Sequence, residues 1–209
     1  MTIDVFLSYF EWFAAAVALT YVIFQVLQKP LMWYLAIVAA VCYLLVYVHN
    51  GLYAMAGVQG YLIGAGIYGL IDWTRSKQRE KGTENEGKIM IRPFEWKVGV
   101  ISVALAVGVF FLLHYLLAKV PAGEDVSPWR PWIDALLATN TVLATFYTGR
   151  RYIISWVMWF VFDIIAAILY FKLGMIPTGI LFSVYVITAI IGFFNWKNNG
   201  VWEEDHSVL

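Results

Sequence analysis

Seven long apolar stretches constrain this chain more than any other feature of its sequence. Hydrophobic residues make up 62% of the 209 positions and charged residues only 13%, whereas soluble domains carry roughly 25% charged residues. A soluble core could not bury so much apolar surface, and a helix that crosses a bilayer needs about 20 mostly apolar residues. The sequence therefore predicts an all-α integral membrane protein. Its seven predicted transmembrane helices cover Tyr9–Leu27, Leu31–Val48, Leu52–Ile71, Val98–Leu117, Trp132–Tyr147, Ile153–Phe171 and Ile176–Phe194.

The basic residues predict how these helices are oriented, because Lys and Arg accumulate on the cytoplasmic side of membrane proteins. Of the 14 Lys and Arg residues, eleven fall on one side of the predicted spans, seven of them in residues 74–97, and three fall on the other side. We expect the N-terminus outside and the C-terminus in the cytoplasm. The first 13 residues contain no Lys or Arg, so they lack the basic start of a signal peptide. The formal net charge is zero, and no nucleic-acid partner is expected.

A shift of 123 residues aligns the chain with itself without a gap from Trp33 to Trp73. The identical pairs are Trp33 and Trp156, Val38 and Val161, Tyr47 and Tyr170, Gly51 and Gly174, Ile67 and Ile190, Gly69 and Gly192, and Trp73 and Trp196. Two units of three helices keep the same orientation when one further helix joins them, and transporters contain parallel repeats of this kind. We therefore expect two parallel three-helix repeats joined by a linker helix, a 3+1+3 arrangement.

The repeat defines the expected organisation of the chain. The predicted segments are the first three-helix repeat (1–73), a cytoplasmic basic loop (74–97), the linker helix with an outer loop (98–131), the second three-helix repeat (132–196) and a cytoplasmic tail (197–209).

One face of the predicted sixth span carries the strongest candidates for a binding site. Trp156, Trp159 and Asp163 are spaced i, i+3 and i+7, which places them on one side of a helix. In the first repeat, Ala36 and Ala40 stand where Trp159 and Asp163 stand in the second. If the two faces oppose each other, the alanines leave room for a planar ligand. An ionisable group inside a span costs roughly 2.5–3.5 kcal/mol on insertion scales, so Asp163 indicates a functional cavity.

The residue types at this face favour a particular ligand chemistry. The face of a tryptophan ring attracts a cation, worth about 2 kcal/mol when desolvated, and a carboxylate supplies the counter-ion. No Lys or Arg lies inside any predicted span, so a phosphate at that depth would have no charged partner. The pattern favours a cationic, unphosphorylated, ring-bearing solute. Other polar or aromatic residues within the spans could line the site or serve helix packing: Gln59, Tyr68, Asn140, Thr141 and Tyr185.

These residues give the chain a resemblance to the Pnu family of bacterial vitamin-precursor transporters, whose best-known branch is the PnuC type for nicotinamide riboside. The most specific part is Arg150, Arg151 and Tyr152, followed by Trp156, Trp159 and Asp163, and then by Tyr170, Gly174 and Thr178. In the first half, the family pattern is matched by Gly51, Tyr53, Ala54, Gln59, Ile67, Tyr68 and Gly69. Glu11 and Asp134 stand where the family keeps acids.

The resemblance implies a seven-helix 3+1+3 fold, a homotrimer and facilitated diffusion across the bacterial inner membrane. The implied substrate is nicotinamide riboside, trapped afterwards by a cytoplasmic kinase. Family branches also carry thiamine or riboflavin. Nicotinamide riboside and thiamine are cations and suit Trp159 and Asp163, whereas riboflavin is neutral. Residue chemistry does not separate the two cations.

Three other functions stay open. A uniporter for a neutral solute such as a sugar has the same architecture but gives Asp163 no task. A proton-coupled transporter would use Asp163 as a relay. A membrane enzyme or receptor is disfavoured because His49, His114 and His206 lie far apart in the sequence without metal spacing, and no nucleophile and base are arranged together. We expect no enzyme activity and no cofactor.

Overall fold

The computed structural model describes residues 3–27, 29–82, 84, 88–119 and 127–202. Seven helices and two short strands occur in this part of the chain. They are α1 (Ile3–Val26), α2 (Leu31–His49), α3 (Tyr53–Glu80), β1 (Ile89–Ile91), α4 (Trp96–Leu117), α5 (Arg130–Gly149), α6 (Ile154–Lys172), α7 (Ile176–Asn199) and β2 (Gly200–Trp202). Residues 120–126 of the predicted outer loop and residues 203–209 of the tail, with His206, lie outside the described residues.

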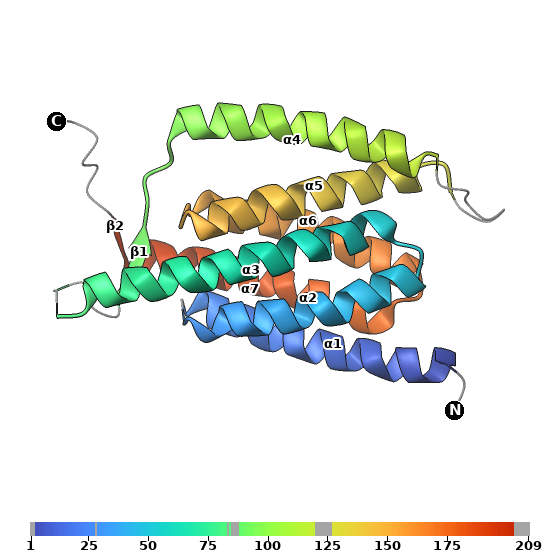
Figure 1. Ribbon diagram of the computed structural model, residues 1–209, viewed down its shortest axis with the longest axis horizontal. Helices are drawn as coiled ribbons and strands as arrows, with labels where there is room; N and C mark the ends of the chain where they lie inside the picture. The colour runs from blue at the N-terminus through green and yellow to red at the C-terminus, as the bar shows by residue number, and fades with distance from the viewer. Residues whose placement is uncertain (1–2, 28, 83, 85–87, 120–126, 203–209) are drawn as a thin grey trace.

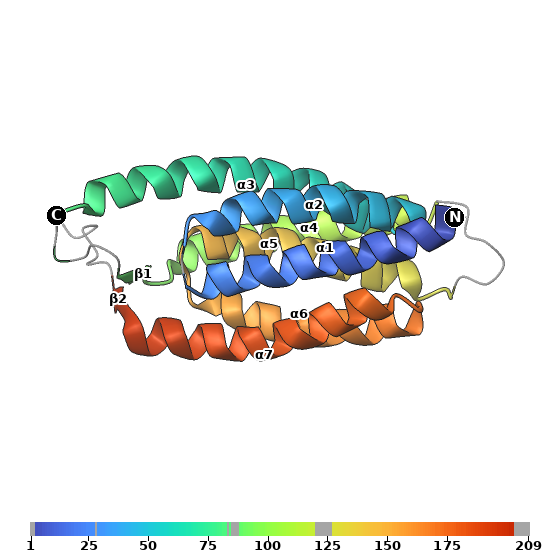
Figure 2. The same cartoon turned by 90° about the horizontal axis from the view of Figure 1, so that it is seen from below.

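The helices lie side by side along one common direction (Figures 1 and 2). Six of them, all except α5, are long and apolar enough to cross a membrane. Because a helix satisfies its own backbone hydrogen bonds, it is stable in lipid, and large apolar side chains such as Leu105 (67% exposed) remain on the outside. The prediction of an all-α integral membrane protein with seven helices is confirmed.

Helix α5 differs from the others because it carries several polar residues. It packs against α3, α4 and α6, and it buries Asp134, Thr139 and Asn140 within the bundle. Its polar side chains are thereby kept away from lipid, where unpaired polar groups are costly. Packing against three other helices explains why this polar segment is a helix of the bundle.

The packing of the helices follows the predicted repeat. Within each half, consecutive helices pack together: α1 on α2 and α2 on α3, then α5 on α6 and α6 on α7. The halves meet where α1 packs on α7 and where α3 packs on α5. Because α1 corresponds to α5 and α3 to α7, these two junctions are equivalent.

Repeated tryptophans and glycines hold the helices of each half together. In the first half, the rings of Trp33 and Trp73 meet edge to face, with centroids 5.6 Å apart. A Cβ atom on Gly69 would lie 2.5 Å from the Trp33 ring, so only glycine allows α2 and α3 to approach this closely. The second half repeats these contacts with Trp156, Trp196 and Gly192.

The turn between the second and third helix of each half also repeats. Gly51 and Gly174 have φ values of 67° and 74°, in the left-handed region that favours glycine. The chain then re-enters a helix through equivalent hydrogen bonds, from Leu52 N–H to the Tyr47 carbonyl (2.8 Å) and from Met175 N–H to the Tyr170 carbonyl (3.0 Å).

Two features depart from the sequence prediction. Helices α3 and α7 run beyond the predicted spans, to Glu80 and Asn199, because hydropathy marks the apolar part of a helix and not its polar end. The predicted basic loop also contains β1, which pairs in parallel with β2. Ile91 of β1 is fully buried and packs beside Trp156 and Trp196. Helix α4 lies at the edge of the bundle, against α5 (Figure 1).

Candidate functional site

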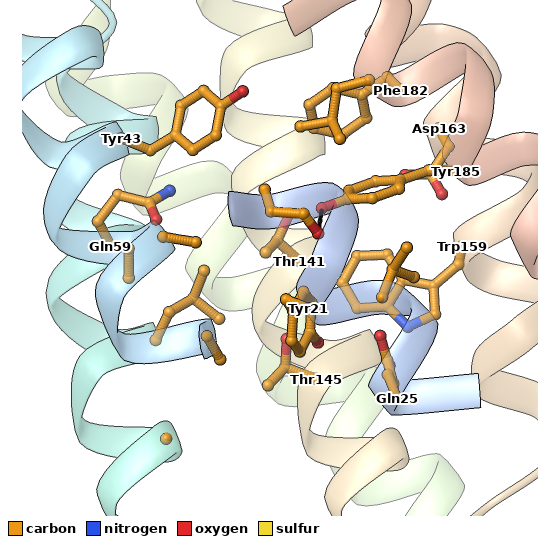
Figure 3. Close-up of a pocket in the computed structure, with 18 of the residues that line it drawn as sticks. Tyr21, Gln25, Tyr43, Gln59, Thr141, Thr145, Trp159, Asp163, Phe182 and Tyr185 are labelled. Atoms are coloured by element: carbon orange, nitrogen blue, oxygen red, sulfur yellow. Dashed lines mark hydrogen bonds between the residues drawn. The ribbon is translucent and has the colours of Figure 1, made fainter. Parts of the chain in front are cut away.

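A cavity of about 140 Å³ lies between the two halves of the bundle. One buried water needs only about 10–15 Å³ measured in the same way, so the cavity has room for a small organic ligand. Its lining comes from α1, α2, α3, α5, α6 and α7. Figure 3 shows the side chains of these six helices converging on one space.

Equivalent positions of the two halves line the cavity, but with different residue types. Ala36 and Ala40 face the same cavity as Trp159 and Asp163, which is the opposed arrangement that the sequence predicted. Three further pairs line it in the same way: Ala18 with Thr141, Val22 with Thr145, and Ala65 with Thr188. At these positions the second half supplies polar or aromatic groups, and the first half supplies small apolar side chains that leave the space open.

A hydrogen bond fixes the ring of Trp159. Its indole N–H donates to the hydroxyl of Thr148 at 3.1 Å, and this buried hydroxyl donates in turn to the carbonyl of Ala144 at 2.9 Å. Trp156 has a different role, because it is 2% exposed and packs edge to face on Trp196. Trp156 thus forms part of the cavity wall. The ring of Trp159, which the hydrogen bond to Thr148 holds in one orientation, faces the cavity.

Asp163 presents a carboxylate to the cavity. The side chain is 3% exposed, and no hydrogen bond or ion pair reaches it from the residues that the structure describes. A buried charge without a partner costs several kcal/mol. A ligand that carries a positive charge or several N–H or O–H donors would supply the missing partner.

Three more of the predicted site residues line the cavity: Gln59, Thr141 and Tyr185. The side chain of each already donates one hydrogen bond to a backbone carbonyl. The Gln59 amide donates to the Met55 carbonyl at 3.3 Å, and the Tyr185 hydroxyl donates to the Ala18 carbonyl at 2.9 Å. Their remaining lone pairs or donors are available to a ligand.

The structure places two predicted site residues away from the cavity. Tyr68 is 71% exposed on the outside of α3, where an aromatic side chain with a polar tip suits a membrane interface. Asn140 is buried in α5 but is not among the residues that line the cavity. It lies one position from Thr141, and a rotation of about 100° per residue moves it to another face of the helix.

Several polar or aromatic lining residues were not predicted from the sequence, among them Tyr21, Gln25, Tyr43, Thr145 and Phe182. Figure 3 shows Tyr43 and Phe182 at one end of the cavity and Gln25 and Thr145 at the other. Tyr21 and Gln25 are spaced i and i+4 within an apolar stretch, which places them on one helix face. This spacing of two polar side chains in an apolar helix is the sequence pattern that indicates Tyr21 and Gln25 as lining residues.

An aromatic and acidic cluster lies at one end of the cavity, where the α2–α3 and α6–α7 turns also lie. The rings of Tyr47 and Tyr170 stack with centroids 6.0 Å apart, and their hydroxyls are 3.2 Å apart. The Glu11 carboxylate accepts hydrogen bonds from the backbone N–H and the hydroxyl of Thr178. Glu11 thus ties α1 to the start of α7, on the side that the charge distribution predicts to be outside.

Asp134, the equivalent of Glu11, forms an ion pair with Arg130 at 3.6 Å. The Arg130 guanidinium also donates to the Asn50 carbonyl at 3.3 Å, so Arg130, held by Asp134, ties α5 to the α2–α3 turn. Asp163 is the only acidic side chain among the described lining residues, and none of these residues is Lys, Arg or His.

Comparisons with known proteins agree with this architecture. The sequence pattern of the nicotinamide mononucleotide transporter family matches residues 8–198. The crystal structure of a vitamin B3 transporter, PnuC, superposes with a TM-score of 0.68 at 17% identity, covering 93% of this chain and 81% of that one. The fold of the two proteins is therefore the same.

Two relatives of this chain are transporters that are named for different substrates. The riboflavin/roseoflavin transporter RibM of Streptomyces davaonensis is 28% identical over 142 residues, which is 68% of this chain and 62% of RibM. The chain thus spans less than two thirds of the length of RibM. The nicotinamide riboside transporter PnuC of Escherichia coli is 19% identical over 192 residues, covering 83% of this chain and 78% of PnuC. The resemblance found in the sequence is confirmed, and the chain belongs to the nicotinamide mononucleotide transporter family.

Proposed function

We propose that the protein transports nicotinamide riboside, an unphosphorylated vitamin precursor, across the bacterial inner membrane by facilitated diffusion. The observation that carries this proposal is the cavity in which the Asp163 carboxylate has no partner among the described residues and the Trp159 ring is held by a hydrogen bond. Transport sites in folds with internal repeats lie near the membrane midplane, between the repeats.

The ligand chemistry follows from these two side chains. Nicotinamide riboside carries a positively charged pyridinium ring, which the face of Trp159 attracts and the Asp163 carboxylate neutralises. The described lining has no Lys, Arg or His, so a phosphate in the cavity would have no cationic partner and would be repelled by Asp163. We therefore favour the nucleoside over the mononucleotide after which the family is described.

Facilitated diffusion is the simplest mechanism for this cavity. Among the described residues that line the cavity, Asp163 is the only Asp, Glu, Lys, Arg or His. The described lining therefore contains no second such residue to relay a proton. A cation would instead follow its own gradient and the membrane potential, and a cytoplasmic kinase would trap it. The test is uptake into proteoliposomes at a fixed membrane potential. Uptake that an uncoupler leaves unchanged supports the proposal, and uptake that collapses would favour proton coupling.

Riboflavin is a second candidate substrate because of the match to RibM at 28% identity. Its ring system is planar and could lie on Trp159, but it is neutral and would leave Asp163 to interact through hydrogen bonds alone. Thiamine is a further alternative, since it is a cation with an aromatic ring and fits the same pair of residues.

We also propose that the N-terminus lies outside, that the C-terminus lies in the cytoplasm and that the protein is a homotrimer. Cys42 is the only cysteine, so a Cys42→Ser background allows single cysteines to be added near either terminus. Labelling in intact cells by a membrane-impermeant maleimide should occur only near the N-terminus. Light scattering after size-exclusion chromatography should give three times the mass of the chain.

The experiment that tests the substrate is calorimetric binding to protein purified in detergent, with nicotinamide riboside, nicotinamide mononucleotide, thiamine, riboflavin and glucose. We expect micromolar binding of nicotinamide riboside and binding of the mononucleotide that is at least about 100-fold weaker, from the loss of some 2.7 kcal/mol. Binding of riboflavin alone would select the second candidate. If folded protein binds none of these vitamins, the proposal is wrong.

A further inference from the structure

We infer that Gln25 is a specificity-determining residue, whose side-chain amide recognises a hydrogen-bond donor and acceptor side by side on the edge of a ring lying against Trp159. This inference rests on the proposed function. It names a residue of α1 that the motifs of the sequence do not include.

Gln25 is a buried polar side chain that has no partner in the described part of the chain. It is 3% exposed and lines the cavity, and no hydrogen bond joins its amide to any of the residues that the structure describes. Buried amides are almost always paired, because an unmade hydrogen bond is costly. Figure 3 shows the Gln25 side chain reaching into the cavity on the side of Trp159 opposite Asp163.

The repeat explains why this amide is free. Gln25 corresponds to Thr148 in the second half, and Thr148 accepts the indole N–H of Trp159. The residue that corresponds to Trp159 in the first half is Ala36, which has no group for Gln25 to bind. Thr148 in the second half thus binds the ring of Trp159, whereas Gln25, at the equivalent position of the first half, faces the cavity.

The chemistry of a glutamine amide defines what it can recognise. It places an N–H donor and a carbonyl acceptor side by side, as in the bidentate pairing of Gln with adenine. A carboxamide on a pyridinium ring, the imide of a flavin and the aminopyrimidine of thiamine all present a complementary edge. When the ring of the ligand lies on Trp159, the hydrogen-bonding edge of that ring would contact Gln25. The positive charge or the hydroxyl groups of the ligand would then contact Asp163.

The test compares two ligands that differ only at this edge. 3-Acetylpyridine riboside keeps the positive charge, the ring and the carbonyl of nicotinamide riboside but has a methyl group in place of the NH₂ group. Gln25→Leu keeps the approximate volume of the side chain and removes its hydrogen bonds. Gln78→Leu is the matched control, because Gln78 is exposed at the far end of α3.

We expect the parent protein and Gln78→Leu to prefer nicotinamide riboside by about 10- to 100-fold, the range for a bidentate contact. In Gln25→Leu this preference should fall toward one, whereas a merely structural role would weaken both ligands equally. An unchanged preference overturns the inference but leaves the proposed function standing. The proposed function fails, and the inference fails with it, if the parent protein binds none of four ligands: the two ribosides, riboflavin and thiamine.

The same design identifies the ring if the parent selects another vitamin. Riboflavin is then compared with 3-methylriboflavin, which lacks the imide N–H, and thiamine with its desamino analogue, which has a hydrogen atom in place of the amino group. A preference that disappears in Gln25→Leu supports the inference for that ring. A preference that persists overturns it.

Discussion

Replacing Asp163 with asparagine tests the electrostatic part of the proposed site. Asn has nearly the same shape as Asp but carries no charge. Because Asp163 is 3% exposed and has no partner among the described residues, the substitution breaks no ion pair within the protein. Any loss of binding therefore reports on the ligand, and the fold should be retained.

The expected magnitude follows from the burial of the carboxylate. Two unit charges about 4 Å apart attract by about 4 kcal/mol at an effective dielectric constant of 20. The ligand gives up hydration to gain this contact, and interactions of charged groups in proteins retain about 1.5–3 kcal/mol. The Kd of nicotinamide riboside should rise by about 10- to 150-fold. The ligand-free variant should melt at the same or a higher temperature, because a buried charge has been removed.

The assay is calorimetric titration of the parent and the variant, with thermal unfolding in detergent as the control for folding. Asp134→Asn is the matched variant, since Asp134 is a buried acid of the same half that lies outside the cavity lining and pairs with Arg130. It should lower the melting temperature but bind the ligand as the parent does. Asp163→Asn with unchanged affinity for a cation would refute the reasoning and favour a neutral solute.

Two further predictions concern the packing around the site. Gly192→Ala would place a Cβ atom 2.5 Å from the Trp156 ring and should cost about 1–3 kcal/mol of stability, seen as a lower melting temperature. Gly64→Ala, where the added Cβ meets nothing within 4 Å, should not lower it, and equal melting of the two variants would contradict the packing. Thr148→Val removes the acceptor of the Trp159 indole and should weaken ligand binding by about 3- to 10-fold, for about 1 kcal/mol. Thr148→Ser should restore binding, and a valine variant that binds like the parent would show that the hydrogen bond does not position the ring.

The internal repeat shows how far sequence alone determines the fold. Hydropathy indicates where six of the seven helices can cross the membrane, because a span needs about 20 mostly apolar residues. The identities at Trp33, Gly69 and Gly51, with their partners 123 residues later, mark contacts and turns that both halves share. Asp163 stands out for the same reason, since an acid in an apolar helix has few explanations other than a cavity.

Only the tertiary structure decides which side of each helix faces the cavity. In a soluble helix the apolar stripe marks the buried face, but in a membrane the lipid-facing and bundle-facing sides are both apolar. Tyr68 and Gln25 illustrate this limit. The sequence favours Tyr68 as a site residue and passes over Gln25, yet Tyr68 is 71% exposed and Gln25 lines the cavity. Their roles depend on the rotation of α3 and α1 about their axes, which the packing of neighbouring helices sets and local sequence does not encode.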